Sequence, residues 1–229
     1  MNFRARLVLT GGVILAMALV AAQPTGSTSN SAHAERESAD GGFARTASGA
    51  GVTVKVARRP NPQTSFDNLN WIECASGTPC RLFDVAYGRG IFVAVGNEGT
   101  LLTSPDGVSW AEQNSHTDER LRGVVFGGGL FVAVGYAGTI ITSKDGVNWT
   151  IRNSGTEQRL QMVAYDKGVF VVVGWQGVIL TSPKGTRWKL RYAGSSERLD
   201  GIAYRDGQFW ATVTNRVISH SPDGIKWNR

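Results

Sequence analysis

Four arginines recur at one fixed spacing, and guanidinium groups pair well with carboxylates and phosphates. They are Arg81, Arg120, Arg159 and Arg198, each 39 residues after the last. If the repeat arranges them around one axis, they form a site for an anion or an acidic peptide. The alternative is that duplication copied one structural arginine, which pairs with acids or carbonyls of a neighbouring unit. Glu119 and Glu197, directly before two of the arginines, can also neutralise part of their charge.

A second group of candidate binding residues follows a short apolar run in each repeat. The residues at equivalent positions are Asn97 and Glu98, then Tyr136, then Trp175 and Gln176, then Asn215 and Arg216. Polar and aromatic residues that vary on a repeated frame are typical of recognition by loops. Tyr136 and Trp175 offer faces on which a sugar ring or a partner side chain can stack. The alternative interpretation is that the sequence of these exposed turns has drifted without functional constraint.

Other residues that could do chemistry are few. Asp84 varies to Gly123, Met162 and Gly201 in later repeats, and a single carboxylate facing a channel is more often solvated than catalytic. The three histidines, His33, His116 and His220, are scattered, so we expect no metal site and no cofactor. A nucleophile elbow, an HExxH motif and a phosphate-binding loop are all missing from the sequence. These features favour a protein that is not an enzyme.

The elements that position these residues repeat with the same period. Five tryptophans mark it: Trp71, Trp110, Trp149, Trp188 and Trp227. A fixed period of about 40 residues is the signature of a repeat fold. Units begin near residues 43, 82, 121, 160 and 199, and the first unit is degenerate. We therefore expect one domain of five units over residues 43–229.

Each unit predicts four β-strands, at 82–87, 91–96, 100–104 and 109–113 in the second unit. These runs are rich in β-branched and aromatic residues and are bounded by glycine or turn residues. Asp-Gly pairs, as at Asp106 and Gly107, indicate tight antiparallel hairpins. Four-stranded units in tandem predict an all-β fold, a β-propeller with five blades. A parallel β-helix is the competing repeat fold.

Closure of the ring is a separate question, because the fifth unit stops soon after its tryptophan. Either the N-terminal segment pairs with the last blade, or a second chain completes the ring. An open sheet edge is a hazard for unwanted pairing. We expect closure within one chain.

The N-terminus predicts export. Residues 1–22 carry Arg4 and Arg6, an apolar run from Leu7 and small residues before a cleavage site after Ala22. An uncleaved membrane anchor is the alternative, although the run is short for a span. Residues 23–42 are polar and small, as in a disordered linker. We therefore expect a secreted or periplasmic protein.

Charge and cysteines limit the class of partner and the redox state. The formal net charge is +6, without the Lys/Arg runs of a nucleic-acid binder. The two cysteines, Cys74 and Cys80, lie close together in sequence, and in an exported protein such a pair predicts a local disulfide. Five intervening residues argue against a CxxC redox motif.

The segments SPDGVSW, SKDGVNW and SPDGIKW resemble the Asp-box, or BNR, hairpin in a form one residue shorter than usual. With the run FVAVG and GTIIT they are similar to secreted bacterial propellers of YVTN/BNR-like repeats, to the photosystem II assembly and stability factor family and, more distantly, to sialidase propellers. The resemblance implies structural roles in the turns for Asp67, Asp106, Asp145 and Asp223, and packing between neighbouring hairpins or blades for the five tryptophans. Lys184 replaces the aspartate in the fourth unit.

The sialidase resemblance also raises the possibility of a glycoside hydrolase. Such enzymes need an arginine cluster, a tyrosine nucleophile activated by a glutamate, and an acid/base aspartate. Here the arginines are equivalent by repeat and every connection is short. A lectin is the second alternative, but repeated sugar sites require repeated ligands, and Tyr136 and Trp175 have no match at Asn97 or Thr214. The favoured interpretation is a protein-binding scaffold with an unidentified protein partner.

Overall fold

The computed structural model describes residues 44–192, 196–214 and 216–228, which form five antiparallel sheets in succession along the chain. Blade 1 contains β1 (Arg45–Gly49), β2 (Val52–Val56), β3 (Gln63–Ser65) and β4 (Ile72–Glu73). Blade 2 contains β5 (Leu82–Gly88), β6 (Ile91–Gly96), β7 (Leu101–Ser104) and β8 (Ala111–Glu112). Blade 3 contains β9 (Leu121–Gly127), β10 (Leu130–Gly135), β11 (Ile140–Ser143) and β12 (Trp149–Arg152).

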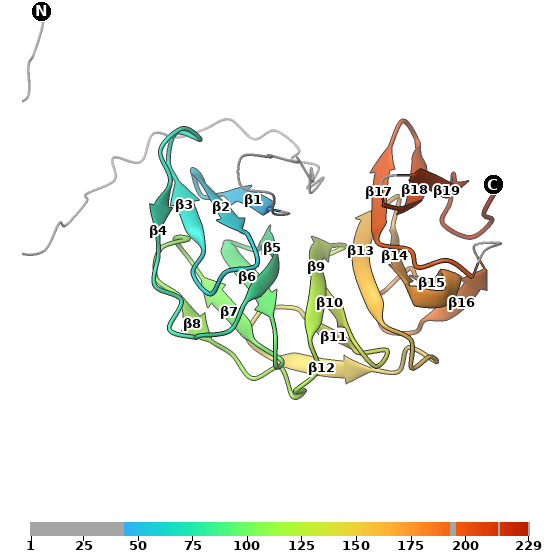
Figure 1. Ribbon diagram of the computed structural model, residues 1–229, viewed down its shortest axis with the longest axis horizontal. Coiled ribbons are helices and arrows are strands. Elements are labelled where there is room, and N and C mark those ends of the chain that lie inside the picture. Colours follow the sequence, from blue (N-terminus) through green and yellow to red (C-terminus); the bar gives the residue numbers. More distant parts are fainter. Residues whose placement is uncertain (1–43, 193–195, 215, 229) are drawn as a thin grey trace, which may run out of the picture.

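Blade 4 contains β13 (Leu160–Asp166), β14 (Val169–Gly174), β15 (Val178–Ser182) and β16 (Lys189–Tyr192), with a 3₁₀ turn, η1 (Trp175–Gly177), between β14 and β15. Blade 5 contains β17 (Gly201–Arg205), β18 (Gln208–Val213) and β19 (Arg216–Ser221). The blades follow an arc, with the first strand of each on the inner side (Figure 1). The fold is a β-propeller of five blades, as the repeat predicts.

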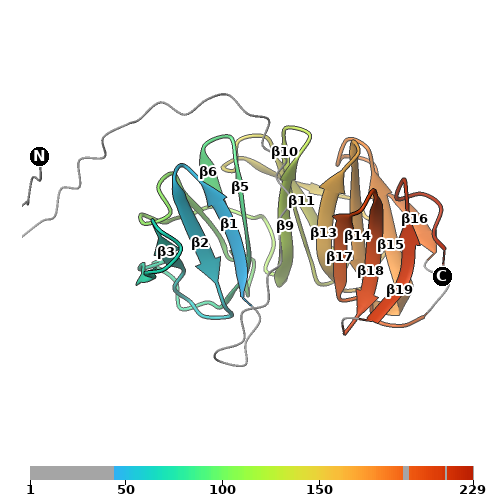
Figure 2. The same cartoon turned by 90° about the horizontal axis from the view of Figure 1, so that it is seen from above.

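The hydrophobic core lies between neighbouring blades. In blades 2, 3 and 4 the second strand carries buried residues on both faces, which explains its continuous apolar sequence. Val93 and Val95 of blade 2 pack against Phe131 and Ala133 of blade 3. Val132 and Val134 of blade 3 then pack against Phe170 of blade 4, and the same pattern continues to blade 5. Figure 2 shows the blades side by side along the arc.

The hairpin between the third and fourth strands also packs on the preceding blade. Gly107 in this hairpin of blade 2 has a φ of +73°, which glycine adopts without steric cost. A Cβ atom there would lie 2.8 Å from Val54 Cγ2 of blade 1. The Asp-Gly sequence is therefore required by both the turn and the blade interface.

The expected closure by the N-terminal segment is wrong for the described residues. Among the residues that the structure describes, β1 pairs only with β2, and the last sheet has the strand order β17-β18-β19, extended by one bridge between His220 and Asn228. Figure 1 shows blades 1 and 5 at the two ends of the arc. The residue types explain this, because Thr53 and Lys55 stand at the positions that Phe92 and Ala94 fill in the apolar interface of blade 2. The outer face of blade 1 is thus polar, as in a terminal repeat that caps an array.

In this structure the two cysteines are free thiols with different neighbours, so the expected disulfide is not confirmed. Cys74 is buried and its Sγ lies 3.7 Å from the carbonyl oxygen of Ile72, whereas Cys80 Sγ lies 3.7 Å from Glu98 Oε2. The predicted signal peptide (1–22) and linker (23–42) lie outside the described residues. Within the described ranges, no helix has the length and apolar character that crossing a membrane requires.

Candidate functional site

The repeated arginines and the variable turns lie together on one face of the propeller. The first residue of the turn between the second and third strands donates its backbone N–H to the carbonyl of the arginine that precedes the first strand. Tyr136 N donates to Arg120 O and Trp175 N to Arg159 O, both at 2.9 Å, and Asn97 N donates to Arg81 O at 3.0 Å. We call the face that carries these turns and arginines the turn face. The carbonyls of these arginines are structural, so the side chains must carry any binding function.

The arginine side chains stack between aromatic rings of successive blades. The Arg120 guanidinium Cζ lies 5.5 Å from the ring centre of Phe83 and 5.1 Å from that of Tyr136. Arg159 Cζ follows at 4.6 Å from Tyr136 and 4.4 Å from Trp175, and Arg198 Cζ lies 5.6 Å from Trp175. Cation–π contacts favour the stacked orientation of a guanidinium group. We call this series the ladder: Phe83, Arg120, Tyr136, Arg159, Trp175 and Arg198.

The ladder has an acidic boundary at blade 5. Glu197 forms an ion pair with Arg216, with its Oε2 2.9 Å from Nη2, and Arg198 lies 3.9 Å from Asp200. Arg159 and Arg198 are exposed and Arg120 is half-buried. Arg81 is exposed as well, at the start of β5. Glu197 thus neutralises Arg216, and Asp200 lies beside the last arginine of the ladder.

One member of the ladder, Phe83, and one neighbour, Arg122, were missed in the sequence. Phe83 begins the ladder in blade 2, and the Cζ of Arg122 lies 4.6 Å from its ring centre. Burial of its guanidinium lowers the pKa of Arg122; nearby Tyr136 raises it, and Arg58 and Arg120 lower it further. The signal was present, because Phe83 and Arg122 share one register position of the first strand. Only the fold shows that this position faces the repeated arginines.

Asp84 does not offer a solvated carboxylate in the channel. It is 7% exposed, and its two oxygens accept the backbone N–H groups of Val85 at 3.0 Å and Val124 at 2.9 Å. Arg45, at the equivalent position in β1, places Nη2 3.3 Å from Met162 Sδ of blade 4. The inner wall is therefore filled by side chains from blades 1, 2 and 4, and Asp84 has a structural role.

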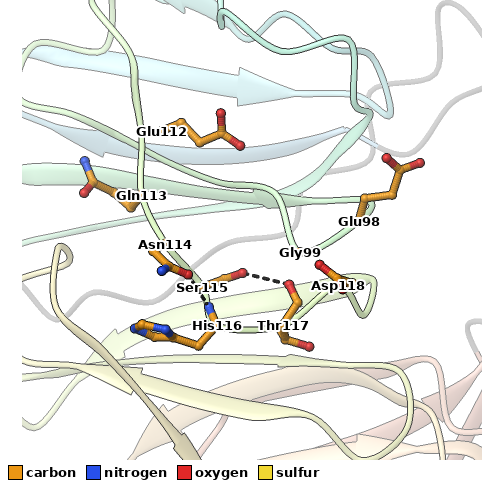
Figure 3. Close-up of a pocket in the computed structure, with 9 residues that line it drawn as sticks. All are labelled: Glu98, Gly99, Glu112, Gln113, Asn114, Ser115, His116, Thr117 and Asp118. Atoms are coloured by element: carbon orange, nitrogen blue, oxygen red, sulfur yellow. Dashed lines mark hydrogen bonds between the residues drawn. The ribbon is translucent and has the colours of Figure 1, made fainter.

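An open hollow of about 560 Å³ lies beside the ladder at blade 2 (Figure 3). Glu98, Glu112 and Asp118 line it with neutral polar residues and His116. Asn97, the neighbouring candidate, has its Oδ1 buried without a hydrogen-bond partner. Among the described residues, no three His, Cys, Asp or Glu side chains are grouped to hold a metal ion. The structure thus places Glu98 in the lining of this hollow, and the Asn97 backbone N–H on the Arg81 carbonyl.

The Asp-box residues lie on the opposite face of the propeller, which we call the box face. Asp145 Oδ1 accepts hydrogen bonds from Ser143 Oγ at 2.9 Å, Val147 N at 2.9 Å and Asn148 N at 2.8 Å. The side chain and backbone of Asn148, followed by Val147 N, hold the pKa of Asp145 well below its usual range. Asp67, Asp106 and Asp223 bind their turns in the same way. These aspartates are saturated by the chain itself.

Trp110, Trp149, Trp188 and Trp227 pack against the hydrophobic clusters between neighbouring blades. Trp149 donates its Nε1–H to the Gly146 carbonyl at 2.7 Å, and its ring lies 6.3 Å from that of Phe131. Trp110 and Trp227 form the same indole hydrogen bond in their own hairpins. Trp71 instead lies under Lys55 Nζ, 4.1 Å from the ring centre. The aspartates and tryptophans therefore maintain the scaffold.

Comparison with known proteins shows the fold. No protein-family model and no curated protein matches the sequence. The chain is similar to YCF48 bound to D1 peptide, with a TM-score of 0.62 and 18% identity over 80% of this chain and 64% of that chain. It is also similar to a chain of the nidogen/laminin complex (TM-score 0.59, 13% identity, 76% and 73% covered) and to the GH74 enzyme of Niastella koreensis (0.54, 18%, 80% and 30%). The chain thus spans less than two thirds of the YCF48 chain that it matches.

Proposed function

We propose that this protein is an exported, non-enzymatic scaffold that binds an acidic segment of a partner protein on the turn face. The ladder is the observation that carries the proposal. Guanidinium groups stacked on aromatic rings lose little further side-chain entropy when they bind a carboxylate. Export rests on the sequence of residues 1–22.

Binding to a glycan has less support, because the aromatic rings are already stacked. Tyr136 lies between Arg120 and Arg159, and Trp175 lies between Arg159 and Arg198. A sugar ring needs an open aromatic face, which would require an arginine to leave. A sialidase-like reaction has less support for a related reason, since the carboxylate of Asp84 is buried and bonded to backbone.

Similar structures are consistent with a binding role. YCF48 was solved with a D1 peptide and nidogen with laminin, so propellers of this shape hold protein ligands. We extend this role to the present chain because its own turn face carries the ladder. We also propose that the repeats are of YVTN/BNR type, and this assignment rests on the sequence of the hairpins.

The proposal is tested with two pairs of substitutions in the full chain. Arg120→Ala/Arg159→Ala removes two guanidinium groups of the ladder. Lys144→Ala/Lys226→Ala removes the same charge from exposed hairpins of the box face. Fluorescent hexaglutamate and hexaglutamine peptides serve as probes, with a pull-down from the envelope fraction of the source organism. Melting temperatures confirm that each variant is folded.

We expect hexaglutamate, and a captured envelope protein, to bind the wild type and the box-face variant but not the ladder variant. Equal loss of hexaglutamate binding in both variants would show that binding depends only on the net charge of the protein. Binding that survives in a folded ladder variant would refute the proposal. A glycan array that detects binding with the wild type but not with Trp175→Ala would favour the lectin alternative.

A further inference from the structure

The hairpin of blade 4 lacks the aspartate that organises the other four. In blades 1, 2, 3 and 5 one carboxylate oxygen accepts a serine hydroxyl at 2.9–3.1 Å and two backbone N–H groups at 2.8–3.0 Å. Blade 4 has Lys184 where those blades have the aspartate. The carboxylate is therefore replaced by a cation.

The strand register and the glycine conformation around that position are nevertheless kept. Ser182 pairs with Phe170 across the sheet as Ser143 pairs with Phe131. Gly185 has a φ of +67°, close to the +80° of Gly146. A Cβ atom on Gly185 would lie 2.6 Å from Leu130 of blade 3, the same kind of contact that Gly146 makes with blade 2. The hairpin of blade 4 thus keeps the backbone shape that surrounds a carboxylate in the other blades.

The donors of this hairpin lack an acceptor within the described residues. Ser182 is 1% exposed and its Oγ has no hydrogen-bond partner. The indole Nε1 of Trp188 is also buried and unpartnered, unlike that of Trp149. The N–H groups of Thr186 and Arg187 match those that bind Asp145 in blade 3, and no carboxylate of the described chain reaches them. A buried donor left without a partner costs about 1–3 kcal/mol.

Electrostatics at this hairpin favour an anion. Lys184, Arg187 and Lys189 lie within seven residues that include no acid, and all three are exposed. Successive backbone N–H groups in a turn form a concave anion site, and hydrogen bonds to a charged acceptor are the strong ones. Shape, donors and charge therefore point to the same ligand class.

We propose that the hairpin of blade 4 is a carboxylate-binding site. The ligand places its carboxylate where Asp145 lies in blade 3, accepting from Ser182 Oγ and from the N–H groups of Thr186 and Arg187. Lys184 supplies the countercharge. The carboxylate belongs either to an aspartate side chain of a polypeptide or to a small free acid. This site lies on the box face and is independent of the ladder.

The test is an NMR titration of the ¹⁵N-labelled full chain with three probes. These are acetate, the capped peptide N-acetyl-Gly-Asp-Gly-amide and the same peptide with Asn in place of Asp. We expect saturable shifts of the Thr186 and Arg187 amides with acetate and the Asp peptide but not with the Asn peptide. Tighter binding of the Asp peptide assigns the carboxylate to a polypeptide, whereas equal binding assigns it to a free acid.

Two variants of Lys184 separate a shaped site from simple attraction. Lys184→Asp fills the site with the chain's own carboxylate, so the saturable shifts should disappear. Lys184→Ala keeps the donors and removes one charge, so binding should weaken and remain. Absence of saturable shifts in the wild type, unchanged binding in Lys184→Asp, or equal loss in both folded variants would overturn the proposal.

Discussion

Asp84 on β5 accepts a hydrogen bond from the backbone N–H of Val124 on β9, at 2.9 Å, and so joins blade 2 to blade 3. The carboxyl group is buried, and this burial raises its pKa, while Arg45 is the strongest influence in the opposite direction. This hydrogen bond between blades is specific to the interface of blades 2 and 3, because Gly123, Met162 and Gly201 occupy the position of Asp84 in later blades. One residue thus departs from the repeat to connect two copies of it.

The first prediction concerns pH. Because the folded-state pKa of Asp84 is raised, folding takes up a proton between the ordinary carboxyl pKa of 3.8 and the folded value. This contribution to stability is fully present below 3.8 and is lost as pH rises through the folded pKa. Asp84→Asn does not titrate, so the melting temperature of the wild type relative to this variant should rise as pH falls from 7 to 4. A constant difference would contradict the raised pKa.

A second prediction is that Lys184→Asp stabilises the protein. The new carboxylate can accept from Ser182 Oγ and from two backbone N–H groups, as Asp145 does in blade 3. A gain of about 1 kcal/mol raises the melting temperature by about 2–4 °C in a domain of this size. Lys226→Asp is the matched control, since it makes the same charge change in a hairpin whose donors are already bound to Asp223. Equal effects of the two substitutions would indicate a general charge effect.

A third prediction concerns the contact between Gly88 and Phe126. A Cβ atom on Gly88 would lie 2.1 Å from the Phe126 ring of the next blade. Gly88→Ala should therefore destabilise the protein by about 1–3 kcal/mol, as overpacking does. Chemical denaturation of Gly88→Ala, Phe126→Ala and the double variant measures the coupling. The alanine should cost much less when Phe126 is removed, and an equal cost in both backgrounds would argue against the contact.

The fourth prediction concerns the degenerate first blade. Val52, Val54 and Val56 cover the apolar face of blade 2 that includes Leu82 and Phe92. Deletion of residues 43–75 should therefore lower the midpoint of thermal unfolding strongly or abolish folding. Deletion of residues 23–42 is the control, and it should leave the midpoint unchanged. An unchanged midpoint after removal of 43–75 would show that blade 1 adds nothing to stability.

The sequence predicted the blade closely because a repeat supplies the same evidence several times. The strands expected at 82–87, 91–96, 100–104 and 109–113 correspond to β5, β6, β7 and β8, with the last shortened to two residues. Alternation of apolar residues and the Asp-Gly turns are local properties, so they can be read without a fold. Closure was predicted incorrectly for the described residues because it depends on whether two faces far apart in sequence match. Thr53 and Lys55 make the outer face of blade 1 polar, so this face is not buried against blade 5.

The sequence by itself determined the period, the blade, and the placement of arginines and variable turns on a common face, because these follow from repeated local patterns. Tertiary structure alone decided that Arg159 lies between Tyr136 and Trp175, that Phe83 and Arg122 extend the series, and that Ser182 lacks a partner. The physical reason is that stacking and hydrogen bonding depend on contacts between adjacent blades. Such contacts join residues that are distant in the chain, and no local pattern specifies how their side chains meet.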